Sequence, residues 1–147
     1  MAKIIPFESA YRDDMIFCLL TAKNRLGRIP RINEDLLDIQ KSYFDKGDMF
    51  WVALDDTGRV IGMVGTDTVS PLDIWLKRLY IMPSMKRNGI AKALLCHAER
   101  FSLSKGASYL HTRFNDAYTE APLFYSACGF SEVGRSDGLR HFIKSLS

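Results

Sequence analysis

One stretch, residues 76–104, constrains the fold of this chain more than any other part of it. Leu79, Tyr80 and Ile81 are strand formers near its start. Pro83 has no backbone N–H, so it ends the predicted strand. A basic loop follows, and apolar residues from Ile90 onward, spaced by four, four and three residues, predict an amphipathic helix. The stretch therefore predicts a strand, a proline turn, a glycine loop and a helix, in that order.

The loop in this stretch has the features of an anion-binding site. It reads Lys86-Arg87-Asn88-Gly89-Ile90-Ala91. Glycine and alanine let another molecule approach the backbone closely, and the helix that follows offers unpaired N–H groups and a positive dipole end. The chain contains neither G-x-x-x-x-G-K-[ST] nor G-x-G-x-x-G. The loop is thus either a sharp turn or a site for a phosphate or pyrophosphate.

The rest of the chain predicts an α/β fold. Strands are expected at residues 3–7, 49–54, 60–68, 73–82, 107–114, 130–134 and 139–144. Further helices are expected from Ser9 as an N-cap to Gly27, after Asn33 as a second N-cap, and over residues 120–127. Because strand 107–114 follows a strand–helix unit, it should lie parallel to strand 73–82. The expected sheet is mixed and mostly antiparallel, with about seven strands and about four flanking helices.

Two segments resemble motifs of the GNAT superfamily of N-acetyltransferases. Residues 77–95 are similar to its core motif, L-x-V-x-P-x-x-[RQ]-x-x-G-x-[GA]. The matching residues are Leu79, Ile81, Pro83, Lys86, Gly89 and Ala91, with Lys86 where Arg or Gln is usual. Residues 123–130, LFYSACGF, resemble the later L-Y-x-x-x-G-F segment. The resemblance covers essentially the whole chain and implies a single GNAT-like domain over residues 1–147, whose parallel strand pair splays apart.

The resemblance also implies a reaction and a co-substrate. GNAT enzymes move an acetyl group from acetyl-CoA to a primary amine by direct attack, so the expected acceptor is a small molecule or a peptide. Acetyl-CoA would lie between the splayed strands 76–82 and 107–114, with its pantetheine amides on the first strand and its pyrophosphate on the glycine loop. The implied cofactor-binding residues are Leu79, Tyr80, Ile81, Lys86, Arg87, Asn88, Gly89, Ile90, Ala91 and Asn115. The loop after Asn115 is longer than in many relatives, by about three residues.

The same resemblance assigns the acid and leaves the base open. Tyr125 matches the usual acid position, and a phenol with a pKa near 10 stays protonated at about pH 7 and can donate. An acceptor amine with a pKa near 10.4 needs a base or a water chain to lose its proton. Trp75 stands where many relatives carry Glu. Asp73 is two residues before Trp75, so the two side chains point to the same face of the strand. Asp73 is the predicted base, with Asp67 and Glu120 as fallbacks.

The acceptor side is predicted from basic and aromatic residues. Arg25, Arg28 and Arg31 crowd the connection that follows the first helix. They form either a solvated basic loop or a site for an anionic part of the substrate, and in GNAT proteins this segment often borders the acceptor. The predicted acceptor-binding residues are Arg28, Arg31 and Trp75.

Charge, hydrophobic runs, cysteines and histidines limit the other function classes that the chain could belong to. A net charge of +3 is too small to indicate nucleic-acid binding by itself. The longest apolar run, residues 15–20, is far shorter than the roughly 20 residues of a membrane span. Three cysteines without metal-ligand spacing indicate a reducing cytoplasm. His97, His111 and His141 lack paired spacing and are expected to be structural or surface residues, so no metal site is predicted.

Two function classes compete with the enzyme. One is a catalytically silent CoA-binding sensor or assembly module, which Trp75 at the usual Glu position keeps open. The other is a nucleic-acid-binding module, which only the basic loops favour and which lacks a stacking platform. The sequence predicts a monomer or a homodimer, with no membrane or nucleic-acid partner.

Overall fold

In a computed structural model, which describes residues 2–29 and 31–146, the chain forms one mixed sheet. Seven strands lie in the order β1-β2-β3-β4-β5-β7-β6. Their bounds are β1 Lys3–Pro6, β2 Phe50–Leu54, β3 Val60–Thr68, β4 Asp73–Ile81, β5 Tyr109–Asn115, β6 Ser131–Ser136 and β7 Leu139–Ser145. Neighbouring strands are antiparallel except β4 and β5, which are parallel. The predicted fold class and the predicted parallel pair are therefore confirmed.

Four α-helices accompany the sheet in the described residues: α1 Arg12–Arg25, α2 Ile39–Ser42, α3 Ile90–Ser104 and α4 Glu120–Ala127. The bounds of α4 and the start of α3 agree with the sequence prediction. The N-cap predicted at Ser9 is wrong, because Ser9 opens a 3-10 turn and neither that turn nor α1 has a side-chain cap. Among the described residues, no helix is long and apolar enough to cross a membrane.

The second predicted helix is broken into short pieces. A 3-10 turn over Glu34–Leu37 precedes α2, and another over Phe44–Lys46 follows it. The side chain of Asn33 caps neither piece, because its Oδ1 accepts a hydrogen bond from Nζ of the buried Lys23 at 2.5 Å. Asp38 caps α2 instead, accepting from the N–H of Lys41 at 3.0 Å. The predicted cap was wrong because the side chain of Asn33 is hydrogen-bonded to the buried Lys23 and not to the backbone of the helix.

Two hydrophobic cores lie on opposite faces of the sheet. The first packs α3 and α4 on the sheet and includes residues from β2 to β5 and Phe142 of β7. The second packs α1 and the segment around α2 on β2 and β3, and it contains no residue of β5, β6 or β7. The second face of those three strands therefore has no such core.

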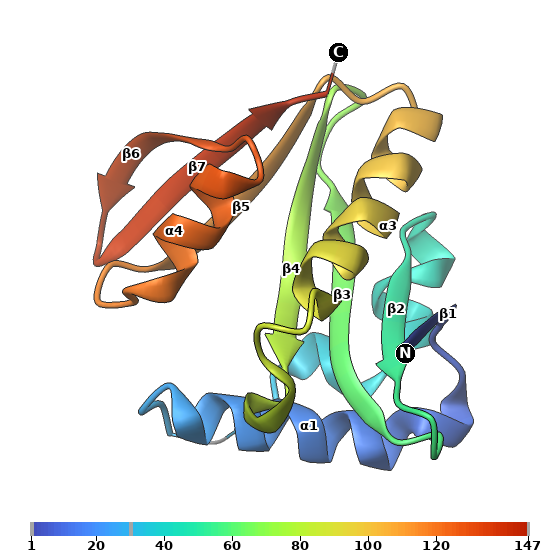
Figure 1. The fold of residues 1–147 in the computed structure, drawn as a ribbon. Coiled ribbons are helices and arrows are strands. Elements are labelled where there is room, and N and C mark those ends of the chain that lie inside the picture. The colour runs from blue at the N-terminus through green and yellow to red at the C-terminus, as the bar shows by residue number, and fades with distance from the viewer. Residues whose placement is uncertain (1, 30, 147) are drawn as a thin grey trace.

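The strands β4 and β5 separate after a short paired stretch. They pair over only three positions, from Asp73 with Tyr109 to Trp75 with His111. A bulge then bends β4, where Arg78 has a φ of 57° and the register with β3 shifts. In Figure 1 the two strands meet at the end where the C-terminus lies and diverge toward the start of α3. The predicted splayed pair is thus present, and α3 begins at its open end.

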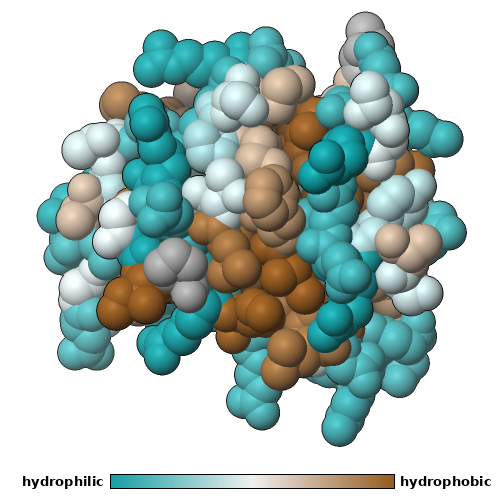
Figure 2. Space-filling view, turned by 90° about the horizontal axis from the view of Figure 1, so that it is seen from below, coloured by the Kyte–Doolittle hydropathy of each residue, from teal (hydrophilic) through white to brown (hydrophobic). Residues whose placement is uncertain are grey.

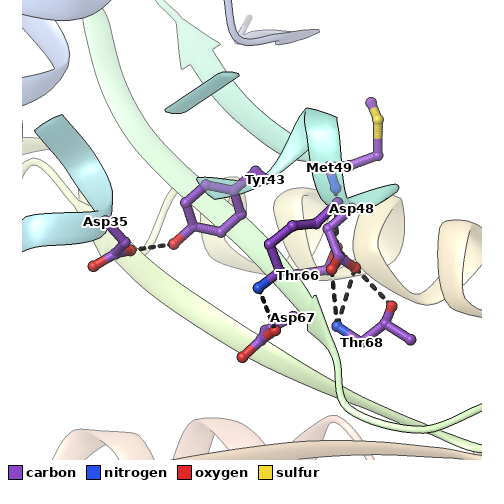
Figure 3. A network of polar contacts seen from close by, with 8 residues as sticks. Asp35, Tyr43, Asp48, Met49, Thr66, Asp67 and Thr68 are labelled. Atoms are coloured by element: carbon purple, nitrogen blue, oxygen red, sulfur yellow. Dashed lines mark hydrogen bonds and ion pairs between the residues drawn. The ribbon is translucent and has the colours of Figure 1, made fainter. Parts of the chain in front are cut away.

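A buried carboxylate ties the start of β2 to the end of β3 (Figure 3). Asp48 is 2% exposed and accepts hydrogen bonds from the hydroxyls of Thr66 and Thr68 and from the N–H of Thr68, at 2.7–3.1 Å. Thr66 and Thr68 lie opposite Leu76 and Ile74 of β4, so this anchor holds the sheet near the end where β4 pairs with β5.

We expect Asp48→Ala to lower the free energy of unfolding by about 2–3 kcal/mol, because several donors lose a buried acceptor. Urea denaturation monitored by circular dichroism measures the change. Asp13→Ala is the control, since the side chain of Asp13 is 99% exposed. Equal stability of the two variants would contradict the anchoring role of Asp48.

Candidate active site

One edge of β4 is free at the gap between the splayed strands. Beyond Trp75, no strand in residues 2–29 and 31–146 pairs with the side of β4 that faces β5. Leu79, Tyr80 and Ile81 lie on this stretch, and the opposite edge of β4 pairs Tyr80 with Met63 on β3. Backbone N–H and C=O groups along such an edge need partners. The stretch can therefore accept an extended ligand as an added strand.

The predicted anion loop lies at the open end of the gap. Gly89 adopts a left-handed conformation with a φ of 76° and caps α3, whose first residues are Ile90 and Ala91. A Cβ added to Gly89 would meet no atom within 4 Å, so the space above it is open. The side chain of Asn88 donates to the carbonyl of Met85 at 3.2 Å, which closes the turn before the helix.

The two cations of the loop differ in their surroundings. Arg87 is exposed and has a φ of 68°. The ammonium of Lys86 lies 3.3 Å from the carboxylate of Glu120 at the start of α4, so an ion pair joins the loop to the other side of the gap. Both partners of this pair are partly exposed, so it is weak and an incoming anion can compete for Lys86.

Tyr125 lies on the face of the gap covered by α4 and is 7% exposed. Its ring stacks on Phe114 of β5 at 5.6 Å and meets Phe124 and Phe130 edge-on. Burial, partly offset by a hydrogen bond from Thr112, raises the pKa of the Tyr125 phenol to about 12. The phenol therefore stays protonated over the whole neutral and mildly alkaline range, as a proton donor must.

A second tyrosine at the gap has an unsatisfied hydroxyl. Tyr118, from the loop between β5 and α4, has a buried hydroxyl without a hydrogen-bond partner among the described residues. Tyr118 lies near Tyr80 of β4, since a negative charge on the Tyr118 oxygen would help to raise the pKa of Tyr80. Buried hydroxyls are nearly always hydrogen-bonded. This orphaned group fits a site that is completed by a polar ligand or by water.

The predicted base Asp73 lies at the paired end of β4, before the gap begins. One of its carboxylate oxygens accepts from the Ser70 hydroxyl at 2.8 Å, and the other lies 2.8 Å from Nε2 of His111. Trp75 stacks on His111 and also on His141, at centroid distances of 4.8 and 4.9 Å. The structure thus joins Asp73 and Trp75 to two histidines that the sequence had left as structural.

The remaining predicted residues lie around the gap. Asn115 ends β5, and its side chain accepts from the N–H of Ala117 at 2.8 Å, so it shapes the longer loop. Of the fallback bases, Asp67 pairs with Lys46 at 3.2 Å (Figure 3), and Glu120 pairs with the glycine loop. Neither carboxylate is a free base in this arrangement.

The basic connection after α1 reaches β4. Nη1 of Arg28 donates to the hydroxyl of Tyr80 at 3.0 Å, and the carbonyl of Arg31 accepts from Nζ of Lys23 at 2.7 Å. Burial and the nearby cations Arg28, Arg78 and Arg31 lower the pKa of Lys23 to about 8. Asp35, which forms an ion pair with Arg78 at 2.8 Å and accepts a hydrogen bond from Tyr43 (Figure 3), supplies negative charge there. The cluster as a whole is positive.

The open end of the gap also borders apolar surface. Figure 2 views the molecule from below and shows hydrophobic side chains gathered in the middle of this face, with hydrophilic ones around them. In Figure 1 α1 crosses this end of the molecule, and Phe17 of α1 is 54% exposed. This end of the molecule therefore presents both apolar and cationic side chains.

Residues 46–132 match the profile of the acetyltransferase (GNAT) domain, which is more than half of the chain. The chain belongs to the GNAT family. A similar curated relative is N-acetyltransferase 8 of Homo sapiens, 33% identical over 108 residues that cover 69% of this chain and 47% of the relative. The chain therefore spans about half the length of the curated relatives that it matches.

Solved GNAT structures share the fold over nearly the entire chain. An acetyltransferase of the GNAT family from Staphylococcus aureus Mu50 superimposes with a TM-score of 0.92 at 23% identity and covers 100% of both chains. The PaiA N-acetyltransferase of Thermoplasma acidophilum, solved in complex with coenzyme A, has a TM-score of 0.79 at 18% identity, with 99% of each chain covered. The predicted GNAT fold is confirmed.

Beyond the GNAT motifs, the sequence reasoning missed several polar residues at the gap. Lys23 follows Met15, Leu19 and Ala22 on the inner face of α1, and a lysine at such a position is a signal of a buried ammonium. His111 and His141 gave no local signal, because the pairing that brings them together joins strands separated by α4 and a hairpin turn.

Proposed function

We propose that this chain is an N-acetyltransferase that moves an acetyl group from acetyl-CoA to a primary amine by direct attack. The observation that carries the proposal is the gap between β4 and β5, with a free strand edge, a glycine-capped helix start and a protonated buried phenol around it. Pantetheine amides would pair with β4 at Leu79 to Ile81, and the N–H groups at the start of α3 would hold the pyrophosphate. The family assignment supports the same co-substrate.

The chemistry assigned to the gap needs a donor for the leaving sulfur. Negative charge grows on the thiolate as the carbon–sulfur bond breaks, and a hydrogen bond formed mainly then accelerates the step. Tyr125 is the proposed donor, because burial keeps its phenol protonated. Asn115 is a proposed contact of the cofactor or of an ordered water.

A screen of amines tests this function. Purified protein and acetyl-CoA are mixed with amino acids, polyamines, aminoglycosides and peptides, and the release of CoA thiol is followed. Transfer to at least one amine, confirmed by mass spectrometry of the product, supports the enzyme. Tight binding of CoA without transfer to any amine would contradict it and favour a silent CoA-binding module. The cytoplasmic location and the oligomeric state remain predictions from the sequence.

The positive cluster beside Tyr80 favours an acceptor that carries an anionic group. Arg28, Arg31 and Lys23 lie near the β4 side of the gap, with Asp35 among them. Arginine binds carboxylates and phosphates through charged hydrogen bonds that are stronger than neutral ones. The proposed acceptor is therefore an amine with a carboxylate or phosphate group, and Trp75 is a further proposed contact.

We expect Arg28→Glu combined with Arg31→Glu to raise KM for such an acceptor about tenfold or more, with a smaller fall in kcat, because charged hydrogen bonds contribute about 1.5–3 kcal/mol. Steady-state kinetics at saturating acetyl-CoA measures both constants. Arg100→Glu on α3 is the control, because it makes the same charge reversal as each of the two substitutions, at an exposed position on another element. A screen whose good acceptors are all polycations would contradict the anionic-acceptor proposal.

A further inference from the structure

Three polar side chains form a continuous hydrogen-bonded chain beside the splay. Nε2 of His111 lies 2.8 Å from Oδ1 of Asp73, and Nδ1 of His111 lies 2.9 Å from Nε2 of His141. The two imidazole centroids are 5.1 Å apart with planes 24° from parallel, and the rings touch through nitrogen atoms 2.9 Å apart, so they meet edge to edge rather than face to face. The indole of Trp75 covers both rings at 4.8 and 4.9 Å. The rings are thereby held in fixed orientation.

The connections determine where the protons lie. An ionised carboxylate can only accept, and the bond from His111 holds the pKa of Asp73 below its usual range. In its neutral form His111 must therefore carry its proton on Nε2, which leaves its Nδ1 as an acceptor. His141 then donates from Nε2, and its Nδ1 keeps a free lone pair. No hydrogen bond to Nδ1 of His141 is found within the described part of the chain.

The free nitrogen lies on the face of the sheet opposite Tyr125. Leu110 and Thr112 of β5 point into the core that contains Tyr125, so His111 between them points to the other face. His111 belongs to the last paired position of β4 and β5. His141 pairs with Arg113, two residues further along β5, where the strands have separated. His141 lies on β7, across β5 from the gap, and the indole of Trp75 reaches it from β4. The chain of side chains thus runs across β5 where the splay begins, on the face away from the proposed acid.

We propose that Nδ1 of His141 is the general base that takes a proton from the acceptor amine, and that His111 and Asp73 position it and stabilise its charged form. The inference rests on the proposed acetyltransfer. In this inference His141, and not Asp73, is the residue that contacts the substrate. The carboxylate of Asp73 acts on His141 through two hydrogen bonds.

The surrounding charges suit this role. Burial, then His111 and Arg113, lower the pKa of His141, so its ring is neutral at about pH 7 and can accept a proton. Asp73 faces the pair from β4, Arg113 faces it from β5, and β6 presents the uncharged Gly134 opposite His141. When His141 gains a proton, the Asp73 carboxylate stabilises the cation through His111.

The step balances in protons and bonds. The ammonium of the acceptor gives one proton to His141, which later passes it to solvent. The neutral nitrogen bonds to the acetyl carbon, and the carbon–sulfur bond breaks. The nitrogen loses its second proton as the leaving sulfur gains one from the phenol of Tyr125, and that second proton restores the phenol. The products are the acetylated amine, CoA thiol and one released proton.

The pH dependence of kcat/KM separates a base from a structural histidine. With the best alkylamine of the screen, the parent should level off above about pH 7, because a neutral histidine deprotonates the ammonium. His141→Gln should be slower by about 10²-fold or more at pH 7, and its kcat/KM should rise tenfold per pH unit toward the pKa of the amine, since only the free amine reacts. His97→Gln, a half-buried histidine on α3, is the control and should keep the profile of the parent.

An NMR titration of ¹⁵N-labelled protein tests the same assignment without an acceptor. At pH 8 both rings should carry their proton on Nε2, and Asp73→Ala should lower the pKa of His141 because a negative charge is lost. A proton on Nδ1 of His141, or identical pH–rate profiles for His141→Gln and the parent, would overturn the inference and leave the acetyltransfer standing. A parent that acetylates no amine would instead overturn the proposed function, and the base with it.

Discussion

Tyr125→Phe should lower kcat about 10²–10⁴-fold, the usual range for loss of a general acid, while acetyl-CoA affinity stays within about twofold of the parent. The substitution removes one oxygen and leaves the ring in place. That ring packs between Phe114, Phe124 and Phe130, so the fold should be retained. Steady-state kinetics on an acceptor from the amine screen, with calorimetry for acetyl-CoA, measures both quantities.

The raised pKa of Tyr125 adds a second expectation. Because burial moves the pKa of the phenol from its usual value near 10 to about 12, the proton is lost only at very high pH. The parent should therefore show no fall in kcat from this group between about pH 7 and pH 10. Tyr109→Phe is the control, since Tyr109 is 42% exposed at the start of β5. Equal turnover by Tyr125→Phe and the parent would exclude Tyr125 as the acid.

Much of the architecture was predictable from local pattern. In the stretch from β4 to α3, Pro83 marks the end of the strand and Gly89 marks the start of the helix. In the structure α3 begins at Ile90, as the spacing predicts. The parallel pairing of β5 follows from the crossover helix and was also predicted. These features depend on residues that are close together in the sequence, so a single sequence is enough to predict them.

The composition of the site was less predictable because it depends on contacts between distant residues. Asp73 and His111 are 38 positions apart and meet through their strands, and His141 joins them from a hairpin after α4. The cap predicted at Asn33 failed for a similar reason, since Lys23, 10 positions earlier, takes its side chain. The hydrogen-bond partners of a polar side chain depend on which residues the fold brings near it, so residue type alone could not predict these partners.

Gly89→Glu should raise the dissociation constant of acetyl-CoA by about 100-fold or more, or about 2.7 kcal/mol. Gly89 adopts a φ of 76°, a region where a side chain costs about 1–2 kcal/mol. Nothing lies within 4 Å of the position of its missing Cβ, so the new carboxylate would occupy the open space above the helix start. There it would repel the CoA pyrophosphate and compete for the N–H groups of α3.

Gly106→Glu separates strain from the effect at the site. Gly106 follows the other end of α3, has a φ of 81° and also has no atom within 4 Å of an added Cβ. Both variants therefore carry the same backbone penalty and the same new charge, about 25 Å apart along one helix. If the loop holds the pyrophosphate, acetyl-CoA should stabilise Gly106→Glu against heat as it does the parent and leave Gly89→Glu unchanged. Calorimetry that finds equal affinity in the two variants would remove the pyrophosphate from this loop, because the variants differ only in where the charge lies.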